Sequence, residues 1–301
     1  MNASLLDFLS QFPQLLVNGI AVGSIIALAA VGLTLTYGIL RLANFAHGDY
    51  MTLGAYFALT ANFLLPEALG GMRIWIAIAV GAVLMIGVAL LAEKLLWSPM
   101  RDRRSTSTTL IIISIGLALF LRNGIILLWG ANNQNYALPV ADAVNLFGIR
   151  IAQSRLVVVG LAILAILGLH YLLQNTKIGK AMRAVADNVD LARVSGINVE
   201  NIVIWTWVLA AGLTAVGGGM YGLITAVRPN MGWFLILPMF ASVILGGIGN
   251  PYGAIAGAYV IGIAQELSTP FIPSEYKLGV ALLLMIVVLL FRPQGIFRGT
   301  L

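Results

Sequence analysis

Long apolar runs separated by short polar segments make up most of this chain. A run of about 18 residues or more with few charges is long enough to cross the hydrocarbon core of a bilayer as a helix. The clearest runs cover residues 15–37, 44–65, 74–97, 108–129, 156–173, 202–227 and 277–291. The pattern predicts an all-α, polytopic membrane protein with about eight transmembrane helices.

One apolar region, residues 235–264, is divided into two arms by the sequence Gly-Gly-Ile-Gly-Asn-Pro-Tyr-Gly. Each arm has only about 11 to 16 residues, too few to span a bilayer, so a broken or re-entrant hairpin is expected. Irregular backbone at membrane depth is tolerated where it is buried in protein or lines a water-filled cavity. A tight turn is a compatible interpretation, since Asn-Pro-Tyr-Gly is typical of turns. The candidate path residues here are Gly246, Gly247, Gly249 and Asn250.

Another polar break lies earlier in the chain and is the first break in chain order: it opens the run 44–65 and contains Asn44, His47, Gly48 and Asp49. Like the second break, at 246–253, it precedes a small-residue helix with Gly-Ala-Tyr. Paired breaks in two halves of a chain are typical of a central transport site. Two interpretations stay open. His47 and Asp49 relay protons, because ionisable groups at membrane depth are usually functional, or His47 and Asn44 satisfy backbone groups that the break frees.

The longest polar interruption is residues 175–200, which carry both charges densely. Asn175, Thr176 and Asp190 are candidate helix caps, and Gly196 is a candidate stop. Its apolar residues recur at spacings of three and four, which predicts two short amphipathic helices. Such an element lies on lipid, docks into a partner's groove, or is simply solvated. The candidate docking residues are Lys180, Met182, Arg183, Val185, Asp187, Asp190, Arg193 and Gly196.

Composition and charge agree with a membrane protein. Hydrophobic residues make up 60% of the chain and charged residues 9%, outside the range of soluble domains. The net charge of +6 does not indicate nucleic-acid binding, because the basic residues cluster at the ends of apolar runs. With residues 175–200 in the cytoplasm, that side holds about eleven Lys and Arg against about five outside. The N-terminus and the loop 131–155 are then external, and the C-terminus is cytoplasmic.

Individual arginines have simple expected roles. Arg101, Arg103 and Arg104 are expected to set orientation beside anionic lipid, and Arg122 to extend to the membrane interface. The chain has no cysteine, which excludes disulfides and thiolate metal sites.

Sequence signatures of catalysis are absent. There is no Gly-x-x-x-x-Gly-Lys-Ser/Thr phosphate loop, no Gly-x-Ser-x-Gly elbow and no His-Glu-x-x-His pair. One His and one Asp fall short of a metal site. We therefore expect a protein that is not an enzyme and holds no cofactor or metal; if ATP drives it, another subunit hydrolyses the ATP.

Four blocks, in order, carry a resemblance to a known family. They are NFAHGD (44–49), GKAMRAVADNVDLARVSGIN (179–198), LGGIGNPYGAIAGA (245–258) and RPQGIF (292–297). Together they resemble the LivH-like permease subunits of ABC importers for branched-chain amino acids. The resemblance covers nearly the whole chain and implies one permease domain, residues 1–301.

The resemblance also implies partners and a location. A second, LivM-like permease completes the pore, two cytoplasmic ATPases hold ATP and Mg, and an extracytoplasmic binding protein delivers the amino acid in a bacterial inner membrane. Residues 179–198 correspond to coupling helices, although the Glu-Ala-Ala start of the older importer motif is missing. The alternatives are a permease for urea or other small solutes, and a self-contained carrier or channel that uses His47 and Asp49.

Overall fold

The computed structural model describes residues 2–137, 143–146 and 149–297 of the chain, and helices account for most of them. The elements in chain order are α1 (Asn2–Leu40), α2 (His47–Leu64), the 3-10 helix η1 (Glu67–Met72), α3 (Arg73–Ala92), the π-helix η2 (Glu93–Trp97), α4 (Ser98–Asp102), α5 (Ser107–Trp129), β1 (Ala143–Leu146), β2 (Ile149–Ala152), α6 (Gln153–Asn175), α7 (Lys177–Asp187), α8 (Val189–Val194), α9 (Val199–Ile224), α10 (Met231–Gly246), α11 (Pro251–Leu267), η3 (Ser274–Tyr276) and α12 (Lys277–Phe291).

Six helical segments within the described residues are long and apolar enough to cross a membrane. They are α1, the continuous segment from η1 to α4, α5, α6, α9, and η3 with α12. Three further helices, α2, α10 and α11, have 18, 16 and 17 residues. The predicted all-α membrane architecture is confirmed, and the divided region 235–264 is the pair α10–α11.

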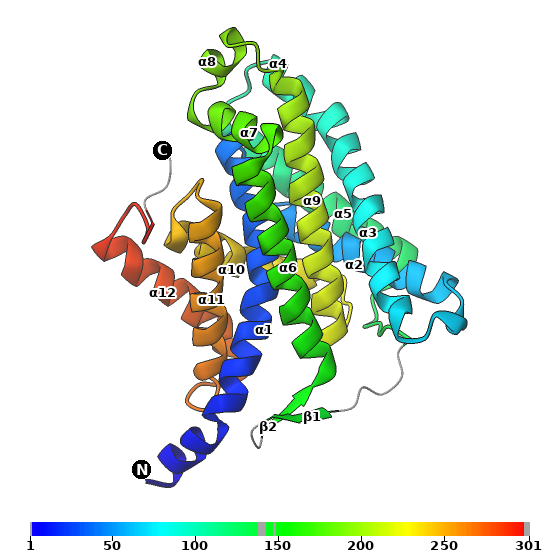
Figure 1. The fold of residues 1–301 in the computed structure, drawn as a ribbon, viewed down its shortest axis with the longest axis vertical. Helices are drawn as coiled ribbons and strands as arrows, with labels where there is room; N and C mark the ends of the chain where they lie inside the picture. The colour runs from blue at the N-terminus through cyan, green and yellow to red at the C-terminus, as the bar shows by residue number, and fades with distance from the viewer. Residues whose placement is uncertain (1, 138–142, 147–148, 298–301) are drawn as a thin grey trace.

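Helix α1 forms the centre of the bundle (Figure 1). In its most apolar window 72% of the residues are buried, whereas the corresponding value for α12 is 6%. Its main neighbour is α11, which runs antiparallel to it, so that Gly19 faces Ile263 and Gly38 faces Gly249. A Cβ atom on Gly19 would lie 2.7 Å from the Ile263 Cα, so glycine permits this close backbone contact.

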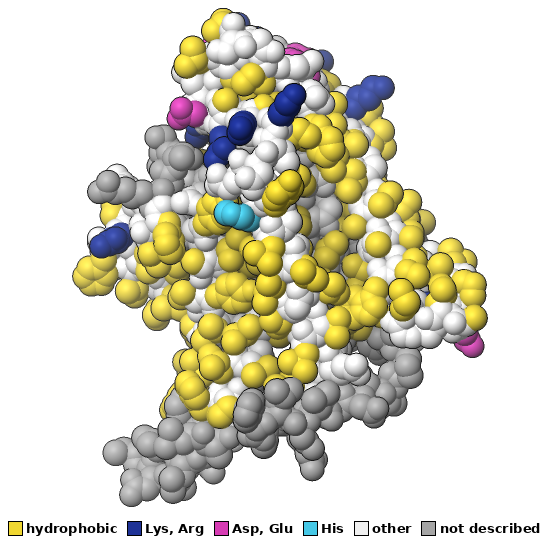
Figure 2. All heavy atoms as spheres, in the orientation of Figure 1, with side chains coloured by type: hydrophobic (Ala, Val, Ile, Leu, Met, Phe, Trp, Pro, Cys, Tyr) yellow, Lys and Arg dark blue, Asp and Glu magenta, His cyan; other side chains and the backbone are white. Residues whose placement is uncertain are grey.

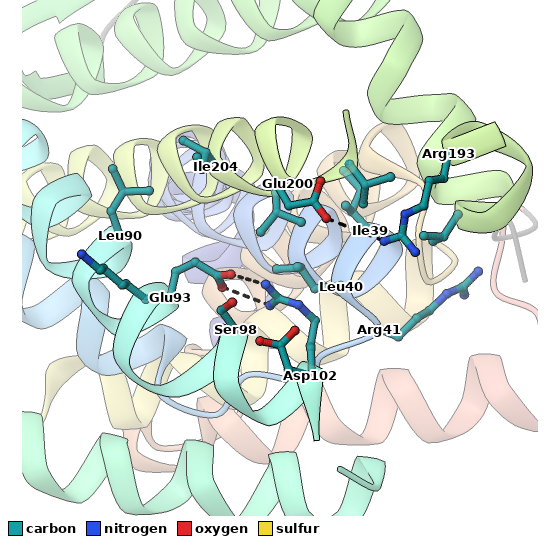
Figure 3. Close-up of a pocket in the computed structure, with 15 residues that line it drawn as sticks. Ile39, Leu40, Arg41, Leu90, Glu93, Ser98, Asp102, Arg193, Glu200 and Ile204 are labelled. Atoms are coloured by element: carbon teal, nitrogen blue, oxygen red, sulfur yellow. Dashed lines mark hydrogen bonds and ion pairs between the residues drawn. The ribbon is translucent and has the colours of Figure 1, made fainter. Parts of the chain in front are cut away.

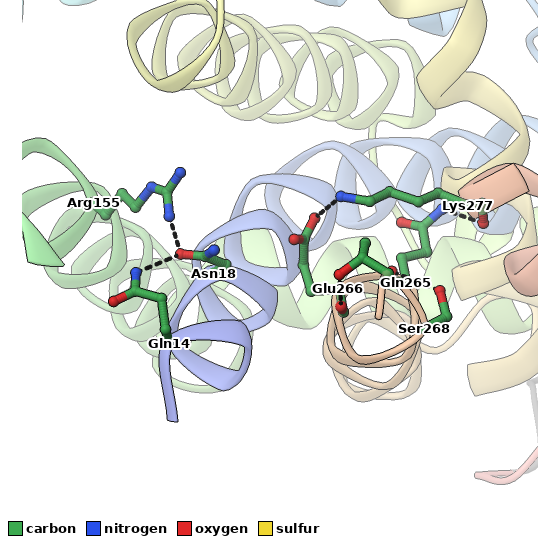
Figure 4. A network of polar contacts seen from close by, with 8 residues as sticks. Gln14, Asn18, Arg155, Gln265, Glu266, Ser268 and Lys277 are labelled. Atoms are coloured by element: carbon green, nitrogen blue, oxygen red, sulfur yellow. Dashed lines mark hydrogen bonds and ion pairs between the residues drawn. The ribbon is translucent and has the colours of Figure 1, made fainter. Parts of the chain in front are cut away.

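The two ends of the bundle differ. Helices α4, α7 and α8 project together at the end where α1 stops, away from the N-terminus (Figure 1). Figure 2 shows Lys and Arg side chains gathered at that end, above a broad hydrophobic belt. At the opposite end, Arg155 of α6 bonds Asn18 of α1, and Lys277 Nζ lies 2.6 Å from Glu266 Oε1 (Figure 4). These contacts join α6 to α1 and α12 to α11 at the end away from α7.

The predicted external loop, residues 131–155, contains a β-hairpin that sequence reasoning missed. β1 and β2 pair antiparallel, with Ala143 opposite Ala152 and Leu146 opposite Ile149. Residues 138–142 and 147–148 of this loop lie outside the described part of the chain. Four-residue strands are too short to leave a clear alternation of apolar and polar positions. A separate backbone bridge joins Gln134 to Val227 and ties the loop to the segment after α9.

Candidate coupling element and translocation site

Two capped helices form the polar element between α6 and α9. The Thr176 hydroxyl accepts from Gly179 N (3.0 Å) and caps α7, as the sequence predicts. For α8 the cap is Asn188, whose Oδ1 accepts from Leu191 N (2.9 Å), not the predicted Asp190. Asp190 lies in the first turn, where a carboxylate is favourable beside the positive end of the helix.

Helix α7 has one buried face and one exposed face. Gly179, Met182 and Val185 are buried and recur every three residues. Gly179 packs directly on the end of α6, since a Cβ there would lie 2.2 Å from the Leu172 carbonyl oxygen. This packing attaches the element to the end of α6.

The eight predicted docking residues separate into two groups. Met182 and Val185 are each 1% exposed, so the prediction that they contact a partner is corrected: they hold α7 on the bundle. The other six are exposed: Lys180, Arg183, Asp187, Asp190, Arg193 and Gly196. Gly196 has φ +85°, which fits the predicted helix stop.

Two docking candidates were missed by sequence reasoning. Leu191 and Val194 on α8 are 62% and 81% exposed, although they belong to the most polar element of the chain. The available signal was their position three residues apart around buried Ala192. With α8 in water, as the sequence predicts, these two exposed apolar side chains are candidates for an interaction surface.

The first break, between α1 and α2, lies in the interior. Asn44 and His47 are fully buried, and Asn44 Oδ1 accepts from Ala46 N (3.0 Å). His47 Nε2 donates to the Ala29 carbonyl oxygen (2.9 Å) and lies 2.8 Å from Thr214 Oγ1. Asn44 thus satisfies backbone at the start of α2, and His47 joins α2 to α1 and α9.

Asp49, in the first turn of α2, forms an ion pair with Arg122 of α5. The two oxygens of Asp49 accept from Arg122 Nε and Nη2, both at 3.2 Å, and Asp49 is 1% exposed. The Arg122 guanidinium also lies 4.5 Å from the centre of the Trp233 ring on α10. The expectation that Arg122 extends to the membrane interface is wrong, because a carboxylate and an aromatic ring hold it inside.

The second break is the turn between α10 and α11. Gly246 and Gly247 are buried, and Asn250 Oδ1 caps α11 by accepting from Tyr252 N and Gly253 N. The segment after α12 covers the turn, since Ile296 N donates to Leu245 O (2.8 Å) and Phe297 N to Gly246 O (3.1 Å). The turn chemistry that the sequence predicted is present, and the C-terminal segment packs on it.

A cavity of about 730 Å³ lies between α8–α9 and the α3–α4 segment, beside the end of α1 (Figure 3). Glu93 and Asp102 lie on one side and Arg193 and Glu200 on the other. Glu93 is paired with Arg101 and accepts from Trp207 Nε1 (2.6 Å). Arg101 therefore has a carboxylate partner, which corrects its expected role as a charge facing lipid.

Comparison with known proteins decides the family. Residues 15–289 match the family described as "Branched-chain amino acid transport system / permease component". The chain belongs to this family. It is 33% identical over 302 residues to the high-affinity branched-chain amino acid transport system permease protein LivH of Escherichia coli K12, and 32% identical over 297 residues to BraD of Pseudomonas aeruginosa. Each alignment covers 95% of both chains.

A solved structure supports the fold independently. The complex of PsaBC from Streptococcus pneumoniae with Fab contains a chain that superposes with a TM-score of 0.54 at 15% identity, covering 96% of this chain and 97% of that one. Family membership makes the chain a multi-pass transport permease of the bacterial inner membrane rather than an enzyme. It also implies separate ATPase and substrate-binding components.

Proposed function

We propose that this chain forms half of the translocation pathway of an ABC importer for branched-chain or other hydrophobic neutral amino acids. The relatives named for branched-chain amino acid transport match 95% of the chain, which supports this substrate class. A paralogous, LivM-like permease forms the other half. Two ATPase subunits bind ATP and Mg, and an extracytoplasmic binding protein delivers the amino acid.

The observation that carries the proposal is the double-faced α7–α8 element. Its buried face packs on the bundle through Met182 and Val185, and its exposed face presents Lys180, Arg183 and the apolar Leu191 and Val194. An apolar pair ringed by charges fits a groove on a water-soluble partner. We assign this face to the ATPase, with α7, α8 and the C-terminus in the cytoplasm and the N-terminus outside.

Contacts at the base of α7 provide a route for force. Arg41, the first residue after α1, donates from Nη2 to the Ala186 carbonyl oxygen (3.3 Å). A cavity of about 80 Å³ is lined by Met182, Arg183 and Ala186 of α7 and by Gly249 of the second break. A shift of α7 in the ATP cycle therefore reaches the α10–α11 turn through adjoining residues.

The residues predicted to line the translocation path act as two hinges. Asn44, His47, Gly48 and Asp49 lie between α1 and α2 and in the first turn of α2, while Gly246, Gly247, Gly249 and Asn250 join α10 to α11. Alternating access follows when α7 moves the second hinge while the first stays fixed. The burial of His47 and Asp49 in a packed interior favours hinge packing over a proton relay.

The test changes the exposed apolar pair of α8. In the assembled transporter, the double variant Leu191→Asp/Val194→Asp is expected to lower ATP-driven leucine uptake by about tenfold or more, because two charges replace an apolar contact in the groove. Membrane insertion is expected to be unchanged, since both side chains are exposed. Arg183→Glu is expected to act in the same direction with a smaller effect.

Ser195→Asp is the matched control. It adds a charge to the neighbouring exposed position without removing apolar surface, so uptake is expected to stay within about twofold of the unmodified protein. Full uptake by the double variant would exclude α8 as the docking site. Uptake of urea but not leucine by the unmodified transporter would refute the substrate class.

A further inference from the structure

A third cavity opens at the end of the bundle opposite α7 and α8. Its volume is about 250 Å³, and no feature of the coupling mechanism involves it. Its wall combines the loop after α5, the end of α9 and the first turn of α10. The lining residues are Asn133, Tyr221, Thr225, Arg228, Asn230, Met231 and Phe234.

Backbone contacts fix the position of this wall. Gln134 and Val227 exchange two backbone hydrogen bonds of 2.9 Å. These bonds hold Asn133 and Arg228 on neighbouring chain segments. Met231 N donates to Arg228 O (3.2 Å), and Gly232 N donates to Thr52 Oγ1 (3.0 Å). The polar groups are therefore positioned by backbone structure and not by one another.

The charge in this cavity is unbalanced. Arg228 is exposed, and no carboxylate in the part of the chain that the structure describes forms an ion pair with it. Among the residues that the structure describes, none that lines the cavity is acidic. A guanidinium with free donors beside two amides and the Tyr221 hydroxyl suits a carboxylate, which accepts two parallel hydrogen bonds from arginine. The Thr225 hydroxyl donates to the Tyr221 carbonyl oxygen (2.8 Å) and is not counted among these donors.

The rest of the lining suits an apolar group. Met231 and Phe234 lie one helical turn apart on α10 and complete the wall. The amide oxygen of Asn133 is available as an acceptor for an ammonium group. A cavity of about 250 Å³ accommodates one small amino acid and excludes a peptide of several residues.

We infer that this cavity is an acceptor site that binds the carboxylate of a hydrophobic α-amino acid as it enters the permease, with Arg228 as the anion-binding residue. The inference rests on the proposed function and adds a place for the substrate. Phe234, which lines the cavity, directly follows Trp233 on α10, and the Arg122 guanidinium lies 4.5 Å from the centre of the Trp233 ring.

Arg228 is tested in the complete transporter, with binding protein and ATPases present. Arg228→Gln is expected to lower the number of leucine molecules transported per ATP hydrolysed by about tenfold, because a charge-assisted bond to the substrate is lost. Stimulation of ATP hydrolysis by the loaded binding protein is expected to stay within about twofold of the unmodified protein. Arg228→Lys is expected to retain much of the coupling.

The absence of cysteine allows a second, direct test. In an Asn230→Cys variant that keeps Arg228, millimolar L-leucine is expected to slow modification by a membrane-impermeant thiol reagent. Leucinamide, which lacks the carboxylate, is expected to give no protection. Glu275→Cys, at the same end of the bundle and outside the cavity, is the control that leucine does not protect.

Each outcome decides the inference. Equal protection by leucinamide, no protection by leucine, or unchanged coupling in Arg228→Gln overturns it. A parallel loss of binding-protein stimulation and transport overturns it too, because Arg228 would then dock the binding protein. If the unmodified transporter fails to move leucine at all, the proposed function fails; if it moves leucine but Asn230→Cys is not protected, only the acceptor site fails.

Discussion

The two helix breaks look alike in sequence and are built in different ways. The first break is held by side chains: His47 bonds the Ala29 carbonyl, and Asp49 pairs with Arg122. The second is held mainly by backbone, because Ile296 N and Phe297 N donate to the carbonyls of Leu245 and Gly246. A polar, glycine-containing break therefore does not by itself specify which groups satisfy its backbone.

The breaks also lie at different levels along α1. His47 contacts Ala29, whereas Gly249 N donates to Thr34 Oγ1 (3.0 Å) and Gly249 faces Gly38. The difference of five to nine residues corresponds to about 8–14 Å along the helix axis. The first break is fixed by buried charge, and the second lies closer to α7 and is covered by residues 295–297. The comparison predicts a rigid hinge and a movable one.

The largest effect is expected at the buried ion pair. Asp49→Asn leaves the Arg122 charge without its partner in the interior, which is expected to destabilise the fold by about 3 kcal/mol. Unfolding of the purified permease in a denaturing detergent titration measures this value. The double variant Asp49→Asn/Arg122→Gln removes both charges and is expected to recover most of the loss. A single variant as stable as the unmodified chain would show that the first break is not fixed by charge.

The next effect is steric. A Cβ on Gly48 would lie 2.3 Å from the Gly232 carbonyl oxygen, so Gly48→Ala forces α2 and α10 apart. We expect a loss of about 2 kcal/mol, typical of overpacking in a core. Gly124→Ala on α5 is the control, because a Cβ there meets no atom within 4 Å. Since alanine favours helix, Gly124→Ala is expected to be neutral or slightly stabilising. If Gly48→Ala and Gly124→Ala are equally stable, α2 and α10 can move apart without cost, and the first break is not rigid.

The sequence predicted the helices better than it predicted their partners. The last helix begins and ends at the predicted residues, 277 and 291, because a long apolar run with polar ends has few alternative structures in lipid. The pairing of Asp49 with Arg122, 73 residues apart, was missed since nothing local links the two. The sequence also could not show which way Val185 faces, because an apolar stripe packs equally well on its own bundle or on a partner.

The smallest effect is expected at the second break, where one side chain contributes two separable contacts. Asn250 Oδ1 caps α11, and Asn250 Nδ2 donates to the Phe297 carbonyl oxygen (3.1 Å). Asn250→Ala removes both and is expected to cost about 1 kcal/mol, the usual value of a lost helix cap. Asn250→Asp keeps the cap oxygen but not the donor, so its stability is expected to lie between those of the alanine variant and the unmodified chain.

Transport distinguishes the two contacts further. If the segment 295–297 must detach for the second break to move, Asn250→Asp is expected to hydrolyse ATP and transport leucine at least as well as the unmodified protein, despite the lost bond. A loss of stability as large as that of Gly48→Ala would show that the second break is as firmly held as the first. In that case the difference between a fixed and a movable hinge would disappear, and α7 would have to act on the bundle as one rigid body.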